Sequence, residues 1–312
     1  MSEQEELKEE TTGLKRPQTR LYAILARQSS KAVIFRRGPT RKVQLISWDR
    51  ATDEFLLGQW FHGRIYERRG DLSPSGDYLI YFAASFDSAK EPNRYYSWTA
   101  VSKPPYLTAL LLWPKKDCWG GGGHFRNETT ILLNHAEEDM ALGEKWTLPP
   151  QMKVKPIDDW AGGGEDSPVG DLRDYRGGWR LAERLDNILI ENYSNTKFSY
   201  PLDPEVWAKT QFKSQEAGYK LATQIVGLHE EKGPWYVQEF AVIDAEERSV
   251  LSLGRCCWAD WDSNGDLLFA KEGKLFRLKS DANFDIDRAI ELIDLSDSKP
   301  YRVTVPEFAK KW

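Results

Sequence analysis

The chain has 312 residues and a formal net charge of −5, with 40% hydrophobic and 29% charged residues. These proportions are ordinary for a globular protein and exclude a chain that is disordered throughout. The acidic balance argues against a general phosphate-binding surface, so we expect no nucleic-acid partner. The 13 tryptophans are numerous and need a structural or binding role.

Residues 1–19 are polar and charged, and we predict that they form a short disordered tail. They lack the basic start and apolar run of a secretory signal. The longest apolar stretch, 107–113, is too short to cross a bilayer. The spacing of Cys118, Cys256 and Cys257 suits neither a disulfide framework nor a zinc site. We therefore predict a cytoplasmic protein with no membrane association.

From residue 21 onward, short runs of β-branched and aromatic residues alternate with turn residues at intervals of about ten residues. The first four runs are 22–25, 31–35, 42–48 and 54–60. This spacing predicts an antiparallel all-β fold, with 49–53 as a hairpin turn. Helical periodicity is scarce, and the best helix candidates are 208–217 and 285–289.

Two segments, 71–77 and 260–266, share a sequence frame. It reads Asp, an apolar residue, Ser or Asp, two variable residues, Gly and Asp, and an apolar strand follows it. In each segment we expect a strand to end, a tight turn to place Gly76 or Gly265 at positive φ, and the next strand to begin at once. Further strands are predicted at 272–278 and 289–295.

The frame resembles the turn of WD-repeat-like, TolB-type β-propellers, which reads Ser-Pro-Asp-Gly. Here the residues from Ser73 to Gly76 and from Asp262 to Gly265 occupy it, and the resemblance covers about a quarter of the chain. It implies a single β-propeller, with five four-stranded blades as the main prediction and six as the alternative. The predicted blades are 20–62, 63–116, 117–203, 204–253 and 254–297.

The resulting organisation has three parts. The acidic and polar tail, 1–19, precedes a propeller domain, 20–298, and a C-terminal tail, 299–312, packs on the propeller. Propeller blades stack face to face through large side chains, so most tryptophans are expected in the packing between blades.

Two glycine-rich stretches, 118–124 and 158–166, are candidate binding loops. Neither has the following helix and Lys-Ser/Thr pair of a phosphate loop. Their glycines either allow strands to approach one another closely near the narrow axis of the propeller, or form the opening of a binding site where the backbone contacts a ligand directly. The candidate binding residues are Trp119, Gly120, Gly121, Gly122, Gly123, His124, Asp158, Asp159, Trp160, Glu165 and Asp166.

An acidic cluster overlaps the second stretch. Its members are Asp158, Asp159, Glu165, Asp166, Asp171 and Asp174. Because these acids crowd into one segment, we expect a solvated or partner-binding loop. A Ca²⁺ site and a catalytic pair of carboxylates at the axial pocket are the alternatives. No other metal or cofactor is predicted.

Basic residues gather in two places, and we expect a solvated face, with a local anion-binding patch as the alternative. The clusters are Arg36, Arg37, Arg41 and Lys42, and Arg64, Arg68 and Arg69.

No local catalytic motif is present, and the four histidines lack metal-ligand spacing. We therefore predict a non-enzymatic module, monomeric by itself, that binds other proteins through Gly/Trp-rich loops on one face. The alternatives are a carbohydrate-active hydrolase or lyase with carboxylates in the axial pocket, and a propeller that binds a small ligand or metal.

Overall fold

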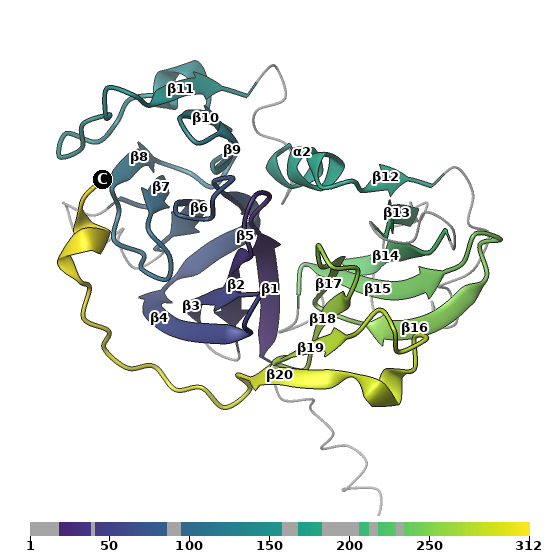
Figure 1. The fold of residues 1–312 in the computed structure, drawn as a ribbon. Coiled ribbons are helices and arrows are strands. Elements are labelled where there is room, and N and C mark those ends of the chain that lie inside the picture. Colours follow the sequence, from purple (N-terminus) through teal and green to yellow (C-terminus); the bar gives the residue numbers. More distant parts are fainter. Residues whose placement is uncertain are drawn as a thin grey trace, which may run out of the picture.

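A computed structural model describes residues 19–38, 41–85, 95–157, 168–182, 206–211, 218–228 and 234–312. This part of the chain is mostly β, with five sheets of three to five strands and one α-helix, α2 (Val169–Arg176) (Figure 1). Strand pairing is antiparallel except between β10 and β11. In the described ranges, no helix is long and apolar enough to cross a membrane.

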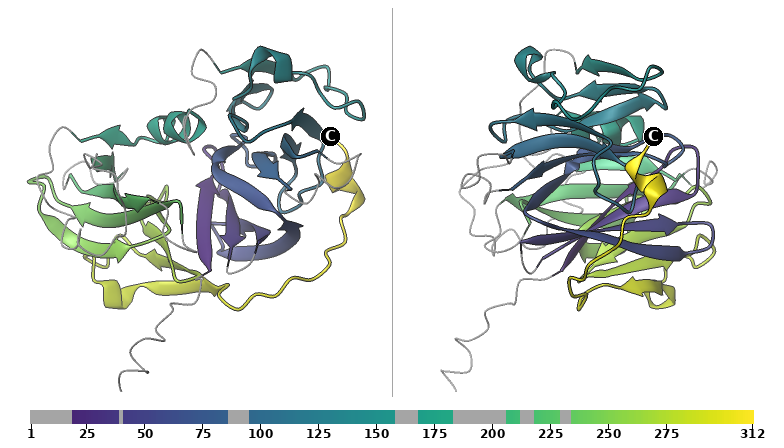
Figure 2. Two further views of the ribbon diagram at one scale, coloured as in Figure 1. Left: turned by 180° about the vertical axis from the view of Figure 1, so that it is seen from behind. Right: turned by 90° about the vertical axis from the view of Figure 1, so that its left-hand side faces the viewer.

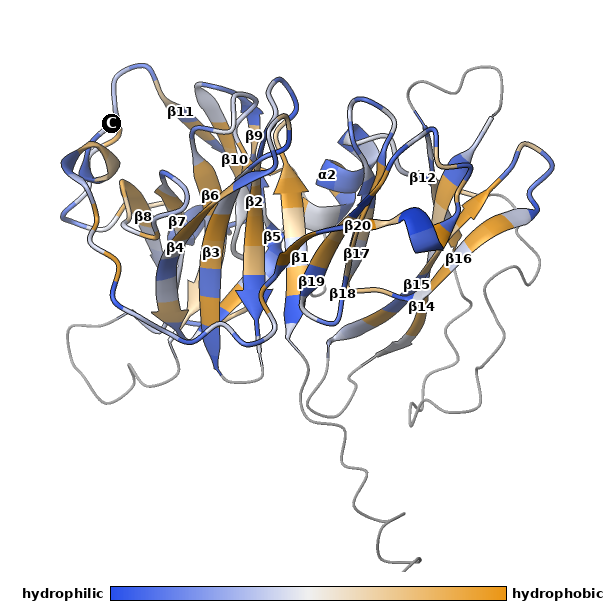
Figure 3. Ribbon diagram, turned by 60° about the horizontal axis from the view of Figure 1, so that its bottom comes forward, coloured by the Kyte–Doolittle hydropathy of each residue, from blue (hydrophilic) through white to orange (hydrophobic). Residues whose placement is uncertain are grey.

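Sheets A, B and E each have four strands in sequence order, as predicted. Sheet A contains β1 (Arg20–Leu25), β2 (Lys31–Arg37), β3 (Lys42–Asp49) and β4 (Glu54–His62). Sheet B contains β5 (Arg64–Leu72), β6 (Leu79–Ala84), β7 (Ser97–Ser102) and β8 (Leu111–Lys115). Sheet E contains β17 (Trp258–Trp261), β18 (Leu267–Lys271), β19 (Lys274–Leu278) and β20 (Ile290–Asp294). Figure 3 shows apolar residues along the strands and hydrophilic residues in many of the turns.

Sheets C and D depart from the predicted four strands. Sheet C has three described strands, β9 (Gly123–Asn127), β10 (Thr130–Leu133) and β11 (Lys153–Pro156), and β11 joins in parallel after a long connection that contains η2 (Glu137–Asp139). Sheet D has five, β12 (Arg180–Leu181), β13 (Val206–Thr210), β14 (Lys220–Leu228), β15 (Tyr236–Ile243) and β16 (Ser249–Arg255). The two-residue β12, which follows α2, is the additional strand.

The helix predictions were wrong wherever the described residues test them. Ala208 lies in β13 and pairs with Ala222 of β14, and 285–289 contains only a single 3₁₀ turn, η4 (Ile286–Arg288). The helix that does form, α2, begins after Pro168 and is terminated by Gly178, which lies at φ +99° and donates to the Tyr175 carbonyl. Both residues are common helix boundary signals, which the sequence prediction did not use.

The turns of the repeated frame form as predicted. Gly76 connects β5 to β6 at φ +79°, and Gly265 connects β17 to β18 at φ +89°. In this left-handed region glycine has no Cβ to collide with the backbone, which is why the frame carries glycine there.

Sheet A is packed on both faces. Phe35 of sheet A and Tyr81 of sheet B belong to one apolar cluster, whereas Trp48 of sheet A and Trp258 of sheet E belong to another. Trp48 is 1% exposed and Trp258 is 7% exposed. For these two tryptophans, the predicted packing between sheets is confirmed.

The remaining sheets extend this stack. Trp113 of sheet B packs in one cluster with Phe125 of sheet C, and Trp261 of sheet E packs in another with Phe240 of sheet D. Helix α2 lies between sheets C and D and contacts β5 and β9 (Figure 1). The order of packing is therefore C, B, A, E, D, with α2 between the last and the first.

A buried ionic network links sheets A and E. Arg277 of β19 pairs with Asp262 at 2.7 Å, Asp266 at 3.0 Å and Asp53 at 2.8 Å. Arg50, from the β3–β4 turn, pairs with the other oxygen of Asp262. The first and fifth sheets are thus joined by charges as well as by apolar contacts.

The C-terminal segment passes along the outside of sheet A and reaches sheet B (Figures 1 and 2). The Tyr301 hydroxyl donates to the Leu57 carbonyl at 3.4 Å, and Lys103 Nζ donates to the Phe308 carbonyl at 3.1 Å. The segment includes η5 (Glu307–Lys310) and ends where the Trp312 ring lies 4.8 Å from the Tyr78 ring.

Candidate functional site

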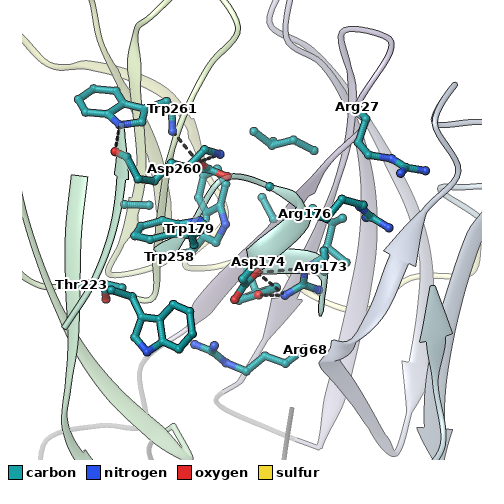
Figure 4. A pocket seen from close by; sticks show the side chains of 18 of the residues that line it. Arg27, Arg68, Arg173, Asp174, Arg176, Trp179, Thr223, Trp258, Asp260 and Trp261 are labelled. Carbon is teal, nitrogen blue, oxygen red and sulfur yellow. Dashed lines mark hydrogen bonds and ion pairs between the residues drawn. The ribbon is translucent and has the colours of Figure 1, made fainter. Parts of the chain in front are cut away.

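A cavity of about 1160 Å³ lies between sheet A, sheet D, sheet E and α2 (Figure 4). Its walls come from β1 and the turn after it, from Arg68 of β5, from α2 and the residues that follow, from β13 to β15, and from β17. The cavity is therefore built from four of the five sheets and α2, which makes it the best candidate for a binding site.

The two sides of the cavity differ in chemistry. Figure 4 shows Arg27, Arg68, Arg173 and Arg176 on the side of sheets A and B and α2. Trp179, Trp258 and Trp261 lie on the other side with Asp260. One wall is basic, and the wall across from it is aromatic.

Arg173 anchors α2 against β1 and β5. Its Nη1 donates to the Gly70 carbonyl at 2.8 Å, and its Nη2 donates to the Tyr22 hydroxyl and to Asp174 Oδ1 at 3.4 Å. Burial lowers the pKa of Arg173, but the Tyr22 and Asp174 oxygens outweigh it and raise the pKa above its ordinary value. Burial also raises the pKa of Tyr22, which keeps its hydroxyl protonated.

Arg176, one turn further along α2, joins the helix to sheets B and C. Its Nη2 pairs with Asp71 at 2.7 Å, and its Nη1 donates to the Phe125 carbonyl at 3.1 Å. Its Nη1 also lies 3.3 Å from His124 Nδ1. Since a guanidinium only donates, Nδ1 accepts and the His124 proton sits on Nε2.

His124 is thus a neutral, buried imidazole beside the cavity wall. It is 8% exposed, and its Nε2 has no partner among the described residues. Burial lowers the pKa of His124. Arg176 determines the tautomer of His124, because the packing of α2 against β9 places the guanidinium next to Nδ1.

Arg68 crosses from β5 toward sheet D. Its guanidinium lies 5.2 Å from the Tyr22 ring centroid and 5.1 Å from the Tyr236 ring centroid, and it donates to Gln238 Oε1. Rings at this distance attract a guanidinium through cation–π interactions.

The aromatic wall is held by its own polar contacts. Trp261 Nε1 donates to the Lys209 carbonyl at 2.9 Å, and Lys209 Nζ pairs with Asp260 at 2.5 Å. Trp179 is 8% exposed. Trp207 is half-buried, so part of its surface faces the cavity.

Most of the charged side chains that line the cavity are ion-paired: Arg50 with Asp262, Arg173 with Asp174, Arg176 with Asp71 and Lys209 with Asp260. Six basic side chains and three carboxylates line the cavity, although the whole chain has a net charge of −5. The basic residues are Arg27, Arg50, Arg68, Arg173, Arg176 and Lys209, and the acids are Asp171, Asp174 and Asp260. Among the described residues, no group of three or more His, Cys, Asp and Glu could hold a metal.

The predicted glycine-rich loop does not line this cavity. Gly120, Gly121, Gly122 and Gly123 are buried, and a Cβ on Gly122 would lie 2.1 Å from the Arg69 carbonyl oxygen. Arg69 holds the loop by donating to the carbonyls of Cys118 and Gly120 at 2.8 and 2.5 Å. These glycines therefore allow close approach of the loop to β5, whereas Trp119 stands 75% exposed beside them.

The other five predicted binding residues lie outside the described residues. They are Asp158, Asp159, Trp160, Glu165 and Asp166. Two further members of the acidic cluster, Asp171 and Asp174, are described, and both line the cavity from α2. The expectation of an acidic loop is wrong for these two residues, which belong to a helix.

The expectation that the basic clusters form a solvated face was also wrong for several members. Arg36 and Arg69 are 3% and 4% exposed, and Arg68 lines the cavity. Arg36 donates to the carbonyls of Leu295 and Ser296, 3.1 and 3.0 Å away, and so joins sheet A to the end of sheet E.

Comparison with known proteins adds no family to this description. No family model matches the chain, and no curated protein matches its sequence. The case for function therefore rests on the residues of the cavity.

Proposed function

We propose that the five sheets are the blades of a β-propeller and that the protein binds a small ligand in the cavity at its centre. The packing order C, B, A, E, D and the position of α2 between D and C support a ring. The first strands of sheets A, B and E, which are β1, β5 and β17, contribute to the cavity. Innermost first strands are typical of propeller blades, and propellers surround a central channel.

The observation that carries the proposal is the two-sided lining of the cavity. A concave pocket with aromatic walls and a few oriented polar groups is the usual form of a small-ligand site. When Asp71 and Asp262, which pair with Arg176 and Arg50 behind the lining, are counted, six basic side chains meet five carboxylates, and this small excess favours a ligand with negative charge. The described residues of the lining have no nucleophile–base pair, so binding without catalysis is the simplest activity.

Thermal melting in the presence of small organic acids, sugar phosphates and their neutral analogues tests this proposal. A ligand that binds only the native state raises the melting temperature. We expect stabilisation by some of the anionic compounds. The matched control is Ile225→Trp, which fills the cavity from β14 and should abolish the stabilisation. Stabilisation that persists in Ile225→Trp would place the ligand elsewhere.

Trp119 favours a second candidate function, the docking of another protein through the Gly/Trp-rich loop. A tryptophan that is 75% exposed beside a buried glycine run resembles an interface anchor. The test compares Trp119→Ala with Trp235→Ala, which removes a second tryptophan that is 36% exposed. A stoichiometric partner that is lost only in Trp119→Ala would support docking, and retention of the partner by that variant would oppose it.

A further inference from the structure

Two arginines of the cavity lining are held side by side by one carbonyl oxygen. Arg27 lies in the turn that follows β1, and Arg176 lies in the last turn of α2. Arg27 Nη2 is 3.0 Å and Arg176 Nη1 is 3.1 Å from the Phe125 oxygen, and both donate to it. Figure 4 shows the two side chains next to one another on the basic side of the cavity. The shared acceptor therefore brings two positive charges together.

The acids near this pair are engaged elsewhere. Asp71 Oδ1 pairs with Arg176 Nη2 at 2.7 Å, and Asp71 Oδ2 accepts from the Phe125 N–H at 2.9 Å. Both carboxylate oxygens of Glu128 contact the turn between β5 and β6. Arg27 therefore makes no ion pair with any residue of the described ranges, in contrast to Arg176.

Arg27 also has donors to spare. A guanidinium has five N–H donors, and the Phe125 carbonyl is the single acceptor that the described residues give to Arg27. The Arg27 side chain is exposed, so a ligand can reach the other donors. Partial burial and repulsion from Arg176 lower the pKa of Arg27 by more than Asp71 and Glu128 raise it, so an added anion would relieve this site.

We infer that Arg27 binds the oxyanion of the cavity's ligand, a carboxylate or a phosphate, and that Arg176 adds positive charge beside it. The Phe125 carbonyl positions both guanidiniums, and binding breaks none of the described hydrogen bonds. Hydrogen bonds between a guanidinium and an oxyanion are stronger than those to neutral acceptors. This inference rests on the proposed function, since it assigns one contact of a ligand in the same cavity.

Chemical modification of the unaltered protein tests the site without any substitution. The reagent p-hydroxyphenylglyoxal reacts with accessible arginines, and mass spectrometry of the digested protein measures the reaction at each position. Arg126 is the internal control, because it is exposed, follows Phe125 directly and does not line the cavity. We expect benzoate and phenyl phosphate to slow the modification of Arg27 but not of Arg126, and neutral benzamide to slow neither. Equal protection of the two arginines, or of neither, would overturn the inference.

Calorimetric titration with the same three probes measures the contribution of Arg27. Arg27→Met should lower the affinity for benzoate and phenyl phosphate by roughly tenfold to a hundredfold, which is the range for a hydrogen bond to a charged group, with little change for benzamide. Arg27→Lys keeps the charge but not the paired N–H groups, so its loss should be smaller. Arg126→Met is the matched control and should bind all three probes as the wild type does. Preference for one acid identifies the oxyanion as a carboxylate or a phosphate.

The outcomes separate this inference from the proposed function. Acid binding that is unchanged in Arg27→Met but abolished by Ile225→Trp would leave the cavity as a binding site and overturn the role of Arg27. An equal loss in Arg27→Met and Arg126→Met would also overturn it, because general attraction of anions would then explain the binding. If none of the probes binds at millimolar concentration, both proposals fail.

Discussion

The turns 71–77 and 260–266 have the same sequence frame but different surroundings. In each turn the glycine N–H donates to the carbonyl of the residue three positions earlier, at 2.8 Å for Gly76 and 2.9 Å for Gly265. Both glycines have positive φ. The turns differ in what surrounds the side chains at the third and last positions of the frame.

The first turn carries a neutral residue, Ser73, at its third position. The Ser73 hydroxyl accepts from the Tyr78 N–H at 3.2 Å, and the Ser29 hydroxyl donates to the Ser75 carbonyl at 2.7 Å. Its last residue, Asp77, pairs with Lys31, and both of these side chains are about half exposed.

The second turn lies within the ionic network between sheets A and E. Asp262, at the position of Ser73, is 3% exposed and pairs with Arg50 and Arg277. Asp266, at the position of Asp77, is 6% exposed and also pairs with Arg277. The shared frame specifies the backbone of the turn, whereas its neighbours decide how much each side chain contributes to stability.

The largest expected difference between the turns comes from their third positions. Asp262→Ala leaves the buried Arg50 and Arg277 with one carboxylate fewer, so we expect the free energy of unfolding to fall by about 3–5 kcal/mol. Ser73→Ala removes a neutral hydrogen bond and should cost about 1 kcal/mol. Urea denaturation followed by tryptophan fluorescence measures both losses. Equal losses would mean that the network between sheets A and E adds nothing.

The pH dependence of the free energy of unfolding separates the contribution of a buried histidine from that of the carboxylates in the turns. His135 is 1% exposed, with Nε2 2.7 Å from Thr99 Oγ1, and burial lowers its pKa from 6.5 to about 4. The unfolded chain therefore binds the proton at higher pH than the folded chain. As pH falls from 6.5 to 4, the free energy of unfolding should fall by roughly 3 kcal/mol through His135 alone.

The carboxylate of the second turn contributes in a lower range. Burial raises the pKa of Asp266, but the Ser280 N–H and Arg277 outweigh it and hold the pKa below the ordinary 3.8. Its stabilising contribution is therefore lost only as the pH falls below 3.8. His135→Gln should flatten the dependence between pH 6.5 and 4, whereas His62→Gln, at an exposed position, should not. An unchanged slope in His135→Gln would contradict the assignment.

Glycine substitution tests the property that the turns share. Gly76→Ala and Gly265→Ala each force a Cβ into the left-handed region, which costs about 1–2 kcal/mol. At Gly76 the added Cβ would also lie 2.7 Å from the Cβ of Lys31, so Gly76→Ala carries an additional penalty. Chemical denaturation gives both values. Gly177→Ala, at φ −70°, is the control and should lose less.

The smallest expected effect is at the last position of the first turn. Asp77→Asn removes an ion pair between half-exposed side chains, and we expect a loss of less than about 0.5 kcal/mol. Added salt should bring the stabilities of the wild type and the variant together, because exposed charges are screened. A loss comparable to that of Asp262→Ala would remove the distinction between the two turns.

Part of the fold was predictable because it is local. The strands 22–25, 31–35, 42–48 and 54–60 were read from alternating and clustered apolar residues, and they form β1 to β4. The requirement for glycine at 76 and 265 follows from the φ angle of a single residue. These features depend on neighbours within a few positions, so the amino-acid sequence determined them by itself.

The cavity was not predictable, because its key contacts join distant parts of the chain. Arg176 meets Asp71 across 105 positions, and Arg68 meets Gln238 across 170. The sequence offered Arg68 as a member of a basic cluster, but nothing local distinguished it from Arg69, which is buried under the glycine loop.

Only the tertiary structure decided that Asp266 is buried in an ion pair whereas Asp77, at the same position of the frame, is half exposed. It also decided how sheets C and D differ from the other three sheets. The parallel β11 and the additional β12 follow from long connections, whose course is set by packing and not by periodicity. A buried charge stabilises or destabilises the fold according to the ion-pair and hydrogen-bond partners that surround it. Only the complete fold brings those partners together.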